Sequence, residues 1–396
     1  MTFGVDGSRP HIVFNLVDDW NWDSWPGHGA SESSQEAARA MLPNIDSLFA
    51  SGGLQLERHY TTRMCAPSRR ALLAGRTVAQ VGVHNIDCPG PPLRIELLPA
   101  VLRRGGYRTH LIGKWCARTH KGHSPGTLAL LTRRCALRRH AGYYSASLLP
   151  SRRGFDSVFG FYRGGVMHEQ HCALRKQRCR THGGANLYDF SATDAAGVER
   201  HVGRRGEHAT SLYAARASEL IAQHAASAAS AASPLFLLIA WSAPHLPYQA
   251  QPGEVAAAVA ARGAAWFSSC SWLSEMYGGG HGLPCEQQEL EGNSDDARGI
   301  YVARKHSDAM CVGVDTALAT LRDALEAAGL WATTLMIFAS DNGGKLENHQ
   351  TNFPLQGGKF SNLEGGIRTV AALGGGFLPA ALRGRTSHAV VHITDW

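Results

Sequence analysis

The sequence is poor in lysine, lacks any apolar run long enough to cross a membrane, and contains no Asn-x-Ser/Thr glycosylation acceptor. Only six of its 39 basic residues are lysine, so the net charge of +7 comes mainly from arginine. Its apolar runs are shorter than the roughly 18 residues that span a bilayer, and no transmembrane helix is predicted. No long basic run is interleaved with aromatic residues, so we expect no nucleic-acid binding.

The rest of the composition is that of an ordinary globular protein. The 396 residues are 44% hydrophobic and 18% charged, which is enough to bury a large core. Residues 1–10 are polar and contain glycine, and they lack the charged start, apolar middle and small-residue cleavage site of a signal peptide. A basic surface suits anionic substrates, although an arginine-rich composition would give the same charge.

Short apolar segments ended by polar residues or glycine are typical of buried strands. Five occur, at residues 11–17, 107–112, 235–240, 334–339 and 370–373. Helical patterns lie between or beside them, at residues 44–51, 68–74, 210–232 and 314–329. Strands that alternate with helices predict an α/β fold with a large, mostly parallel sheet sandwiched between helices. Two regions, 120–151 and 251–299, show no regular spacing of apolar residues. We interpret them as insertions in a single domain over residues 10–396.

Ionisable or metal-binding side chains follow four of the predicted strands. In chain order they are Asp18-Asp19, Lys114, His245 and Asp341-Asn342. Ligands of an open parallel sheet bind beyond the carboxyl ends of its strands, so these side chains are expected to converge on one site. Taken singly, an Asp pair also caps helices and Asn-Gly also forms turns.

The predicted cluster contains a set of side chains that offers only oxygen ligands: Asp18, Asp19, Asp341 and Asn342. Such a set suits Ca²⁺ or Mg²⁺ better than zinc or copper. Three carboxylates packed together without a metal would repel one another, and at least one would stay protonated. A divalent cation removes that conflict and can polarise an oxygen of an anionic substrate.

The segment Cys65-Ala66-Pro67-Ser68-Arg69 is predicted to lie on a loop just before a helix, because Pro67 and Ser68 suit a helix start. The positive end of the helix dipole would then lie beside Cys65. A single cysteine is most often a small buried hydrophobe, and from these residues alone that interpretation stays open.

Together with Leu72-Leu73-Ala74-Gly75-Arg76, this segment resembles the signature of the sulfatase family, part of the alkaline-phosphatase-like superfamily; it differs at Ala74, where the family usually has threonine. The resemblance covers nearly the whole chain outside the two predicted insertions and is closest to arylsulfatase B-type sulfatases. Other segments resemble family motifs in the family's order: Asp18-Asp19, Gly113-Lys114-Trp115, Arg153-Gly154-Phe155-Asp156, Phe159-Gly160, Pro244-His245-x-Pro247, Asp341-Asn342-Gly343-Gly344, Lys359, Glu364-Gly365-Gly366-x-Arg368 and His392-x-x-Asp395-Trp396.

The resemblance implies a hydrolase of aryl or sugar sulfate esters, the latter of the glycosaminoglycan type. Cys65 would be converted to formylglycine by the formylglycine-generating enzyme, and the hydrated group would attack sulfur. The metal, Ca²⁺ in preference to Mg²⁺, would be held by the four oxygen-bearing side chains named above together with residue 65. Arg69, Lys114 and Lys359 would neutralise charge on the transferring group. His245 would help to protonate the departing alcohol.

The sequence departs from the family at Cys116, where the family has a histidine two residues after the motif lysine. A thiol is a weaker hydrogen-bond partner and a different base. We therefore expect slow release of the sulfated enzyme or no turnover. The family's smaller C-terminal subdomain is also expected to be absent from this chain. Two alternatives stay open: a sulfatase-like protein that binds a metal or anion without turnover, and a related phosphoester hydrolase.

Histidines and cysteines gather in a second region, at His168, His171, Cys172, Cys179 and His182. Their spacing is not the paired Cys-x₂₋₄-Cys arrangement of zinc sites. The family often has a short-range disulfide here, so the resemblance implies a Cys172–Cys179 bond. Formylglycine formation in eukaryotes belongs to the secretory pathway. An active protein is therefore expected in lysosomes or outside the cell, through a targeting segment that residues 1–10 do not contain.

Overall fold

The computed structural model of the chain describes most of the predicted elements. The described residues are 9–29, 31–81, 91–115, 146–162, 164–172, 188–193, 197–227, 233–269, 300–348 and 350–396. Cys116, Cys179 and His182 lie outside them, as do residues 120–145 and 270–299 of the two predicted insertions.

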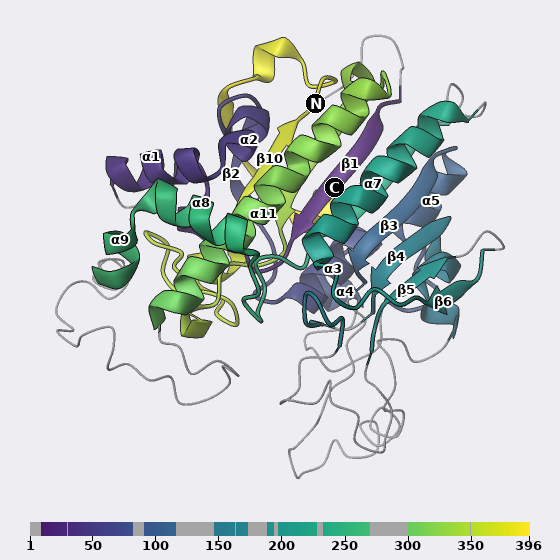
Figure 1. The fold of residues 1–396 in the computed structure, drawn as a ribbon. Coiled ribbons are helices and arrows are strands. Elements are labelled where there is room, and N and C mark those ends of the chain that lie inside the picture. Colours follow the sequence, from purple (N-terminus) through teal and green to yellow (C-terminus); the bar gives the residue numbers. More distant parts are fainter. Residues whose placement is uncertain are drawn as a thin grey trace, which may run out of the picture.

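One large mixed sheet runs through the molecule (Figure 1). Its strands are β1 (His11–Val17), β2 (Leu54–Tyr60), β3 (Arg108–Lys114), β4 (Ser157–Phe161), β5 (Ser191–Thr193), β6 (Glu199–His201), β7 (Leu235–Ala240), β8 (Thr334–Ser340), β9 (Arg368–Thr369), β10 (Ala371–Gly374) and β11 (Arg385–His392). Their order is β11-β2-β10-β8-β1-β7-β3-β4-β5-β6, with β9 paired to β2. The central run from β8 to β4 is parallel, whereas β10, β9, β5 and β6 pair antiparallel. The predicted α/β fold is confirmed.

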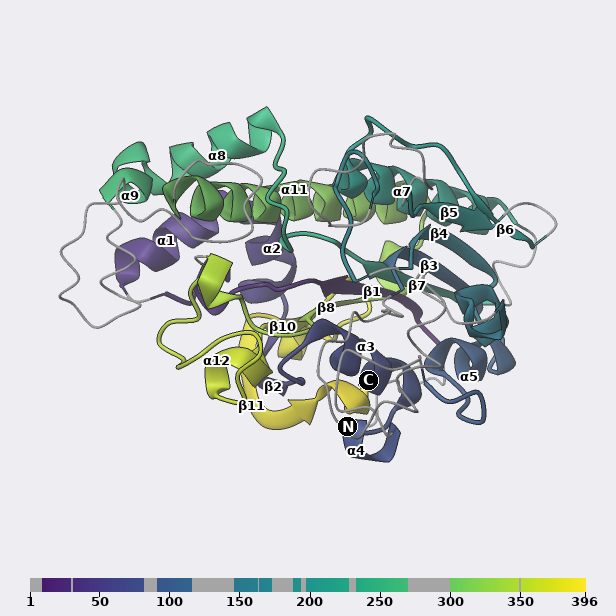
Figure 2. The ribbon, with the colours of Figure 1, turned by 90° about the horizontal axis from the view of Figure 1, so that it is seen from below.

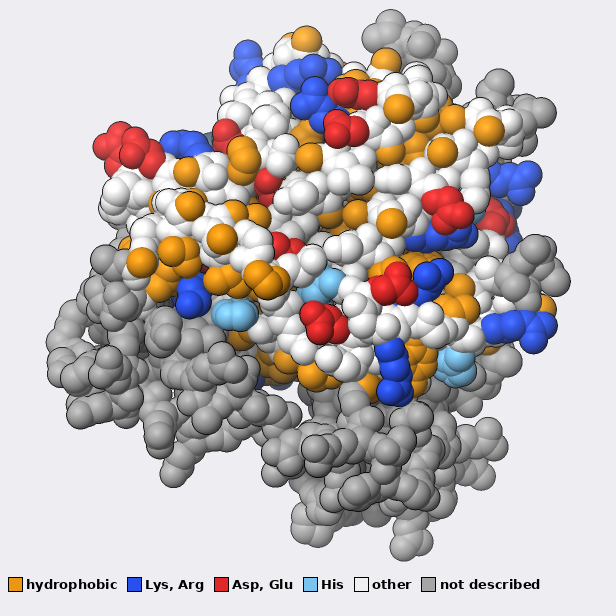
Figure 3. Space-filling model, viewed as in Figure 1, with side chains coloured by type: hydrophobic (Ala, Val, Ile, Leu, Met, Phe, Trp, Pro, Cys, Tyr) orange, Lys and Arg blue, Asp and Glu red, His pale blue; other side chains and the backbone are white. Residues whose placement is uncertain are grey.

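Helices cover both faces of this sheet (Figure 2). They are α1 (Glu32–Met41), α2 (Pro43–Ile45), α3 (Cys65–Ala74), α4 (Val78–Val81), α5 (Leu98–Arg104), α7 (Ala209–Ala226), α8 (Pro252–Arg262), α9 (Ala264–Ser269), α11 (Ile300–Ala327) and α12 (Glu364–Ile367). Helices α7, α8 and α11 lie on one face, and α3, α4 and α5 lie on the other. On the face formed by α7 and α11, acidic and basic side chains are interspersed (Figure 3), so the net positive charge is not gathered there.

The central strands are apolar on both faces because helices bury both of them. In β1, Val13 and Val17 pack into the core beneath α7 and α11, whereas Phe14 and Leu16 pack into the core above α3. All six residues of β7 are buried. Burying such a side chain contributes about 1.5–3 kcal/mol, so these strands anchor the sheet. Polar residues at their ends are therefore presented from a rigid frame.

Five sequence-based expectations need correction. Cys65 is the first residue of α3 and does not lie on the loop before it. Helix α11 begins at Ile300, well before residue 314, and α7 ends at Ala226. Residues 252–269, expected within an irregular insertion, form α8 and α9. The sheet also has six strands that were not predicted: β2, β4, β5, β6, β9 and β11. Within the described part of the chain, no helix combines the length and apolarity needed to cross a membrane.

Candidate active site and metal centre

The carboxyl ends of β1 and β8 bring four polar residues together. Val17 pairs with Ser340 in parallel register, so the residues that follow each strand emerge side by side. The amide of Asp19 donates to Asp341 Oδ1 at 3.3 Å, and Asn342 Nδ2 donates to Asp19 Oδ1 at 2.8 Å. Asp18, Asp19, Asp341 and Asn342 are each at most 1% exposed. The predicted convergence at this edge of the sheet is therefore present.

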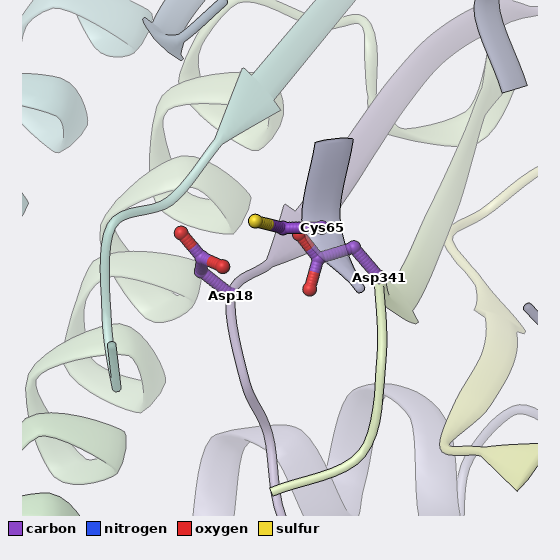
Figure 4. A group of neighbouring side chains, drawn as sticks. All are labelled: Asp18, Cys65 and Asp341. Atoms are coloured by element: carbon purple, nitrogen blue, oxygen red, sulfur yellow. The ribbon is translucent and has the colours of Figure 1, made fainter. Parts of the chain in front are cut away.

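Cys65 faces the same place from the first turn of α3. Its sulfur and carboxylate oxygens of Asp18 and Asp341 lie within 4.8 Å of one another, and Figure 4 shows the three side chains pointing toward a common space. The hydroxyl of Ser68 fixes the approach to the helix: it accepts from the amide of Thr62 at 3.0 Å and lies 2.9 Å from the carbonyl of Met64. Ser68 thus holds the segment that presents Cys65.

Three buried cations surround the carboxylates. Lys114, the last residue of β3, lies 2.5 Å from Asp18 Oδ2. Lys359 lies 2.5 Å from Asp19 Oδ1, and Arg69 Nε lies 2.7 Å from Asp341 Oδ2. Each carboxylate is thus paired with a different cation. Buried charges persist in a protein when they are paired in this way.

The pKa values of two neighbouring carboxyl groups move in opposite directions. Burial raises the pKa of Asp18, but the charges of Lys114, His245 and Arg69 outweigh it and hold that pKa below its ordinary value. Burial raises the pKa of Asp341 well above its ordinary value, and Arg69 opposes this shift only in part. Close carboxylates that cannot both ionise at ordinary pH behave in this way.

His245 enters the site from the segment after β7. Its Nδ1 lies 2.6 Å from the carbonyl of Leu246, and because a carbonyl only accepts, Nδ1 carries the hydrogen. Nε2 is left facing Asp19 Oδ2 at 3.7 Å. Burial lowers the pKa of His245; Asp18 and Asp19 oppose this shift, and the nearby lysines add to it.

Two buried oxygen atoms of the site have no hydrogen-bond partner among the described residues: Asp18 Oδ1 and Asn342 Oδ1. A buried acceptor without a partner is costly, and a bound cation is a common explanation for one. Asp18 also belongs to both groups of described His, Cys, Asp and Glu side chains that could hold a metal; the second group adds Asp19 and His245. The donor set and these two oxygens fit a hard divalent cation.

Close backbone packing positions Lys359. A Cβ atom on Gly343 would lie 1.8 Å from the carbonyl of Gly365, and one on Gly366 would lie 2.1 Å from the carbonyl of Ser361. Only glycine fits at such distances. The amide of Lys359 also donates to the carbonyl of Gly344 at 3.0 Å. The two glycine motifs of the sequence thus hold the lysine loop against the metal-site loop.

The second histidine cluster is built differently. His168 Nε2 lies 3.2 Å from the carbonyl of His245, and His171 Nε2 lies 3.0 Å from that of Glu207. Neither belongs to a candidate metal group among the described residues. Cys172 is disulfide-bonded; its expected partner, Cys179, lies outside the described residues, so the pairing stays a prediction.

One residue of the site gave no signal in the sequence. Gln350 lies in a polar loop without a recognisable motif. Its side chain donates to the carbonyl of Asp19 at 2.8 Å and to Ser307 Oγ at 3.2 Å, and its Oε1 accepts from the amide of Lys345 at 2.8 Å. It joins α11, the loop after β8 and the loop after β1.

Residues 10–395 match the sequence model of a protein family described as Sulfatase. Arylsulfatase J of Mus musculus is 28% identical over 397 residues, which cover 98% of this chain and 51% of that protein. N-acetylgalactosamine-6-sulfatase of Mus musculus is 26% identical over 407 residues, 98% of this chain and 61% of that protein. The chain thus spans about half to three-fifths of the length of these two relatives.

Solved structures share the fold. The crystal structure of Ps i-CgsB in complex with k-i-k-neocarrahexaose superposes with a TM-score of 0.67 at 23% identity, over 98% of this chain and 70% of that one. The phosphonate monoester hydrolase of Agrobacterium radiobacter superposes with a TM-score of 0.56 at 20% identity, over 98% of this chain and 72% of that one.

Proposed function

The chain belongs to the sulfatase family, and we propose that it hydrolyses sulfate esters at the site formed by Cys65, Asp18 and Asp341. The observation that carries the proposal is the position of the Cys65 sulfur. It lies with two carboxylates in a space bordered by buried cations. We further propose an ester of an aryl group or a sugar as substrate, because the two relatives are named for an arylsulfatase and for a sulfatase of N-acetylgalactosamine 6-sulfate. The motif-level likeness to arylsulfatase B-type enzymes is part of the same proposal.

The residues that would hold a metal are Asp18, Asp19, Asp341 and Asn342. The oxygens of Asp18 and Asn342 that have no hydrogen-bond partner among the described residues support this assignment. We propose Ca²⁺ in preference to Mg²⁺, because Ca²⁺ accepts the irregular geometry of an all-protein oxygen set more readily. The cation supplies a Lewis acid that polarises an oxygen of the ester.

Cys65 would carry the nucleophile. Formylglycine at this position supplies a hydrated aldehyde whose hydroxyl can attack sulfur. Helix α3 fixes the direction of the side chain at residue 65, and Ser68 fixes the segment that precedes the helix. The positive end of the α3 dipole would favour negative charge on the attacking group.

Lys114, Arg69 and Lys359 would neutralise charge on the sulfuryl oxygens. Their positive ends are already held in the site by Asp18, Asp341 and Asp19. Cations fixed before the reaction stabilise developing charge without reorganising, which is commonly the largest contribution to catalysis. His245 would deliver a proton from Nε2 to the departing alcohol, because its Nδ1 is committed to the carbonyl of Leu246.

The formylglycine-generating enzyme would be a necessary partner, and we propose the secretory pathway, with a lysosomal or extracellular destination, as the compartment. The disulfide at Cys172 supports an oxidising environment.

One observation favours a second candidate, a sulfatase-like protein that binds without turnover. Cys116 occupies the position where the family has a histidine. In that case the metal and the sulfate would still bind, because the residues proposed to hold them, Asp18 and the lysines among them, are present, and only the last chemical step would be slow.

The test is to co-express the chain with a formylglycine-generating enzyme and to measure peptide mass across Cys65. Conversion lowers the mass by about 18 Da relative to cysteine. The modified, Ca²⁺-loaded protein should hydrolyse 4-nitrophenyl sulfate faster than 4-nitrophenyl phosphate, and a Cys65→Ala variant should hydrolyse neither. A fully modified, metal-loaded protein without sulfatase turnover would favour the binding-only alternative. Preference for the phosphate would favour a phosphoester hydrolase.

A further inference from the structure

Phe360 has a backbone conformation that its residue type rarely adopts. Its φ is +76°, in the left-handed region, which bulky side chains enter at a cost in conformational free energy. Glycine would take this position without strain. The residue is nevertheless 42% exposed, so burial is incomplete for a side chain of this size. A strained, exposed aromatic residue is a candidate for a functional contact.

Two neighbouring segments hold the backbone of Phe360 in this conformation. The amide of Phe360 donates to the carbonyl of Arg63 at 2.8 Å, and Arg63 Nη1 donates to the carbonyl of Phe360 at 3.3 Å. Arg63 lies two residues before Cys65. On the other side, the amide of Lys359 is fixed to Gly344, in the metal-site loop. The point at which the Phe360 side chain leaves the backbone is therefore fixed by the two segments that build the site.

The ring lies beside two cations, and one of them, Lys359, enters the site. The ammonium of Lys359 is 5.7 Å from the ring centroid, and that of Lys345 is 5.8 Å away. The Lys359 ammonium is the same group that contacts Asp19 inside the site. If the anionic group of a ligand binds Lys359, the part of the ligand attached to that group would lie within reach of the Phe360 ring.

From these contacts we infer that Phe360 is a specificity-determining residue, which packs against a ring attached to the sulfate oxygen of the substrate. The inference rests on the proposed function for the sulfate ester, and it adds the residue that contacts the ring of the leaving group. The apolar face of an aryl or sugar ring fits an exposed aromatic face, whereas a short alkyl group offers it little surface.

Binding of sulfonates tests this contact without turnover, because their C–S bond is not hydrolysed. The ligands are phenylmethanesulfonate, the sugar sulfonate sulfoquinovose, and ethanesulfonate, which has no ring. Each is titrated calorimetrically into the Ca²⁺-loaded protein. At least one ring ligand should bind roughly 3- to 10-fold more tightly than ethanesulfonate, the range expected for one aromatic contact. The tighter of the two identifies the aryl or the sugar class.

The variant Phe360→Gly should remove that preference and leave the affinity for ethanesulfonate within about 2-fold, since the Lys359–Asp19 ion pair and the metal site keep all their side chains. It should melt no lower than the wild type, because glycine relieves the strain. Phe360→Asn, which also tolerates the left-handed region, provides a second variant. Leu363→Ala removes another exposed apolar side chain from the same loop and is the matched control; it should keep the preference.

Three results would overturn the inference: no ring preference in the wild type, an unchanged preference in Phe360→Gly and Phe360→Asn, or an equal loss of affinity for all three ligands. None of them depends on turnover. Absence of sulfatase activity in the modified protein would count against the proposed function and leave this binding result as it stands.

Discussion

The side chain of Gln350 donates a hydrogen bond to the main-chain carbonyl of Asp19, at a distance of 2.8 Å and across 331 positions of sequence. Asp19 has a φ of +63°, a conformation uncommon for a residue with a side chain. Gln350 therefore helps to hold a strained backbone that directs the Asp19 carboxylate into the site.

Gln350→Glu should weaken Ca²⁺ binding. The substitution keeps an acceptor for the amide of Lys345 but removes the donor to Asp19, and a lost hydrogen bond to a buried group costs about 1–3 kcal/mol. We expect a roughly tenfold higher Kd for Ca²⁺ by titration calorimetry. The matched control is Gln223→Glu on the exposed surface of α7, which should leave the Kd unchanged. An unaltered Kd in Gln350→Glu would show that Asp19 needs no such support.

The pH profile of turnover should report His245. If Nε2 delivers a proton, the active form is the imidazolium, which is present below the pKa and lost as pH rises through it. Burial and the nearby lysines lower that pKa from its ordinary value of 6.5. The falling limb of kcat should therefore lie below pH 6.5. His245→Gln should remove this limb and slow sugar sulfates more than 4-nitrophenyl sulfate, whose leaving group needs no proton. A limb above pH 7, or equal effects on both substrates, would argue against this role.

Asp315 should make stability depend on pH. Its carboxylate accepts from the amide of Ile45 and from Asn44, each at 2.7 Å, but burial raises its pKa from 3.8 to about 6. The folded state thus favours the protonated form, so the contribution of this group to stability is greatest below pH 3.8 and is lost as pH rises through 6. The loss amounts to about 3 kcal/mol.

The variant Asp315→Asn lacks this titration. Its unfolding free energy, relative to the wild type, should rise by up to about 3 kcal/mol between pH 4 and pH 6.5, as measured by urea denaturation at each pH. Asp323→Asn, at an exposed position of the same helix, is the control. Its unfolding free energy relative to the wild type should change little between pH 4 and pH 6.5. A pH-independent difference for Asp315→Asn would contradict the prediction.

Cys116→His should accelerate turnover of the formylglycine-containing protein. An imidazole is a better proton acceptor near neutral pH than a thiol of ordinary pKa. The gain should appear in kcat under saturating substrate, and the initial burst of alcohol release should stay the same, because the change acts on release of the sulfate. No gain in kcat would mean that residue 116 does not limit the reaction.

The sequence predicted the parts of the fold whose signal is local. Strand β1 and strand β7 were found with their observed bounds because both faces are buried and every position is apolar or nearly so. The polar residues at the carboxyl ends of β1, β3, β7 and β8 were found because each lies at the end of a strand or shortly after it in the sequence. Their convergence follows from parallel pairing, a rule of topology that needs no side-chain detail.

The missed elements depend on contacts between distant residues. The first half of α11 carries Arg304, Ser307 and Asp308, all fully buried. Arg304 pairs with Asp23, and Asp308 pairs with Arg262 of α8. Charged residues at buried positions hide the apolar period on which helix prediction depends. Strand β11 is mostly exposed and is defined only by its pairing with β2. Gln350 was missed for the same reason, since its partner lies at the other end of the chain.

The burial of Cys65 limits when it can be modified. The residue is only 8% exposed, and its sulfur lies within 4.8 Å of a carboxylate oxygen of Asp341, which is in place only when β8 has added to β1. Those two strands are more than 300 positions apart, and pairing over so long a loop is slow. Under the proposed function, the enzyme that modifies Cys65 would reach the sulfur most readily between synthesis of the segment around residue 65 and docking of β8. Substitutions that speed this late docking should lower the modified fraction even when they stabilise the finished protein.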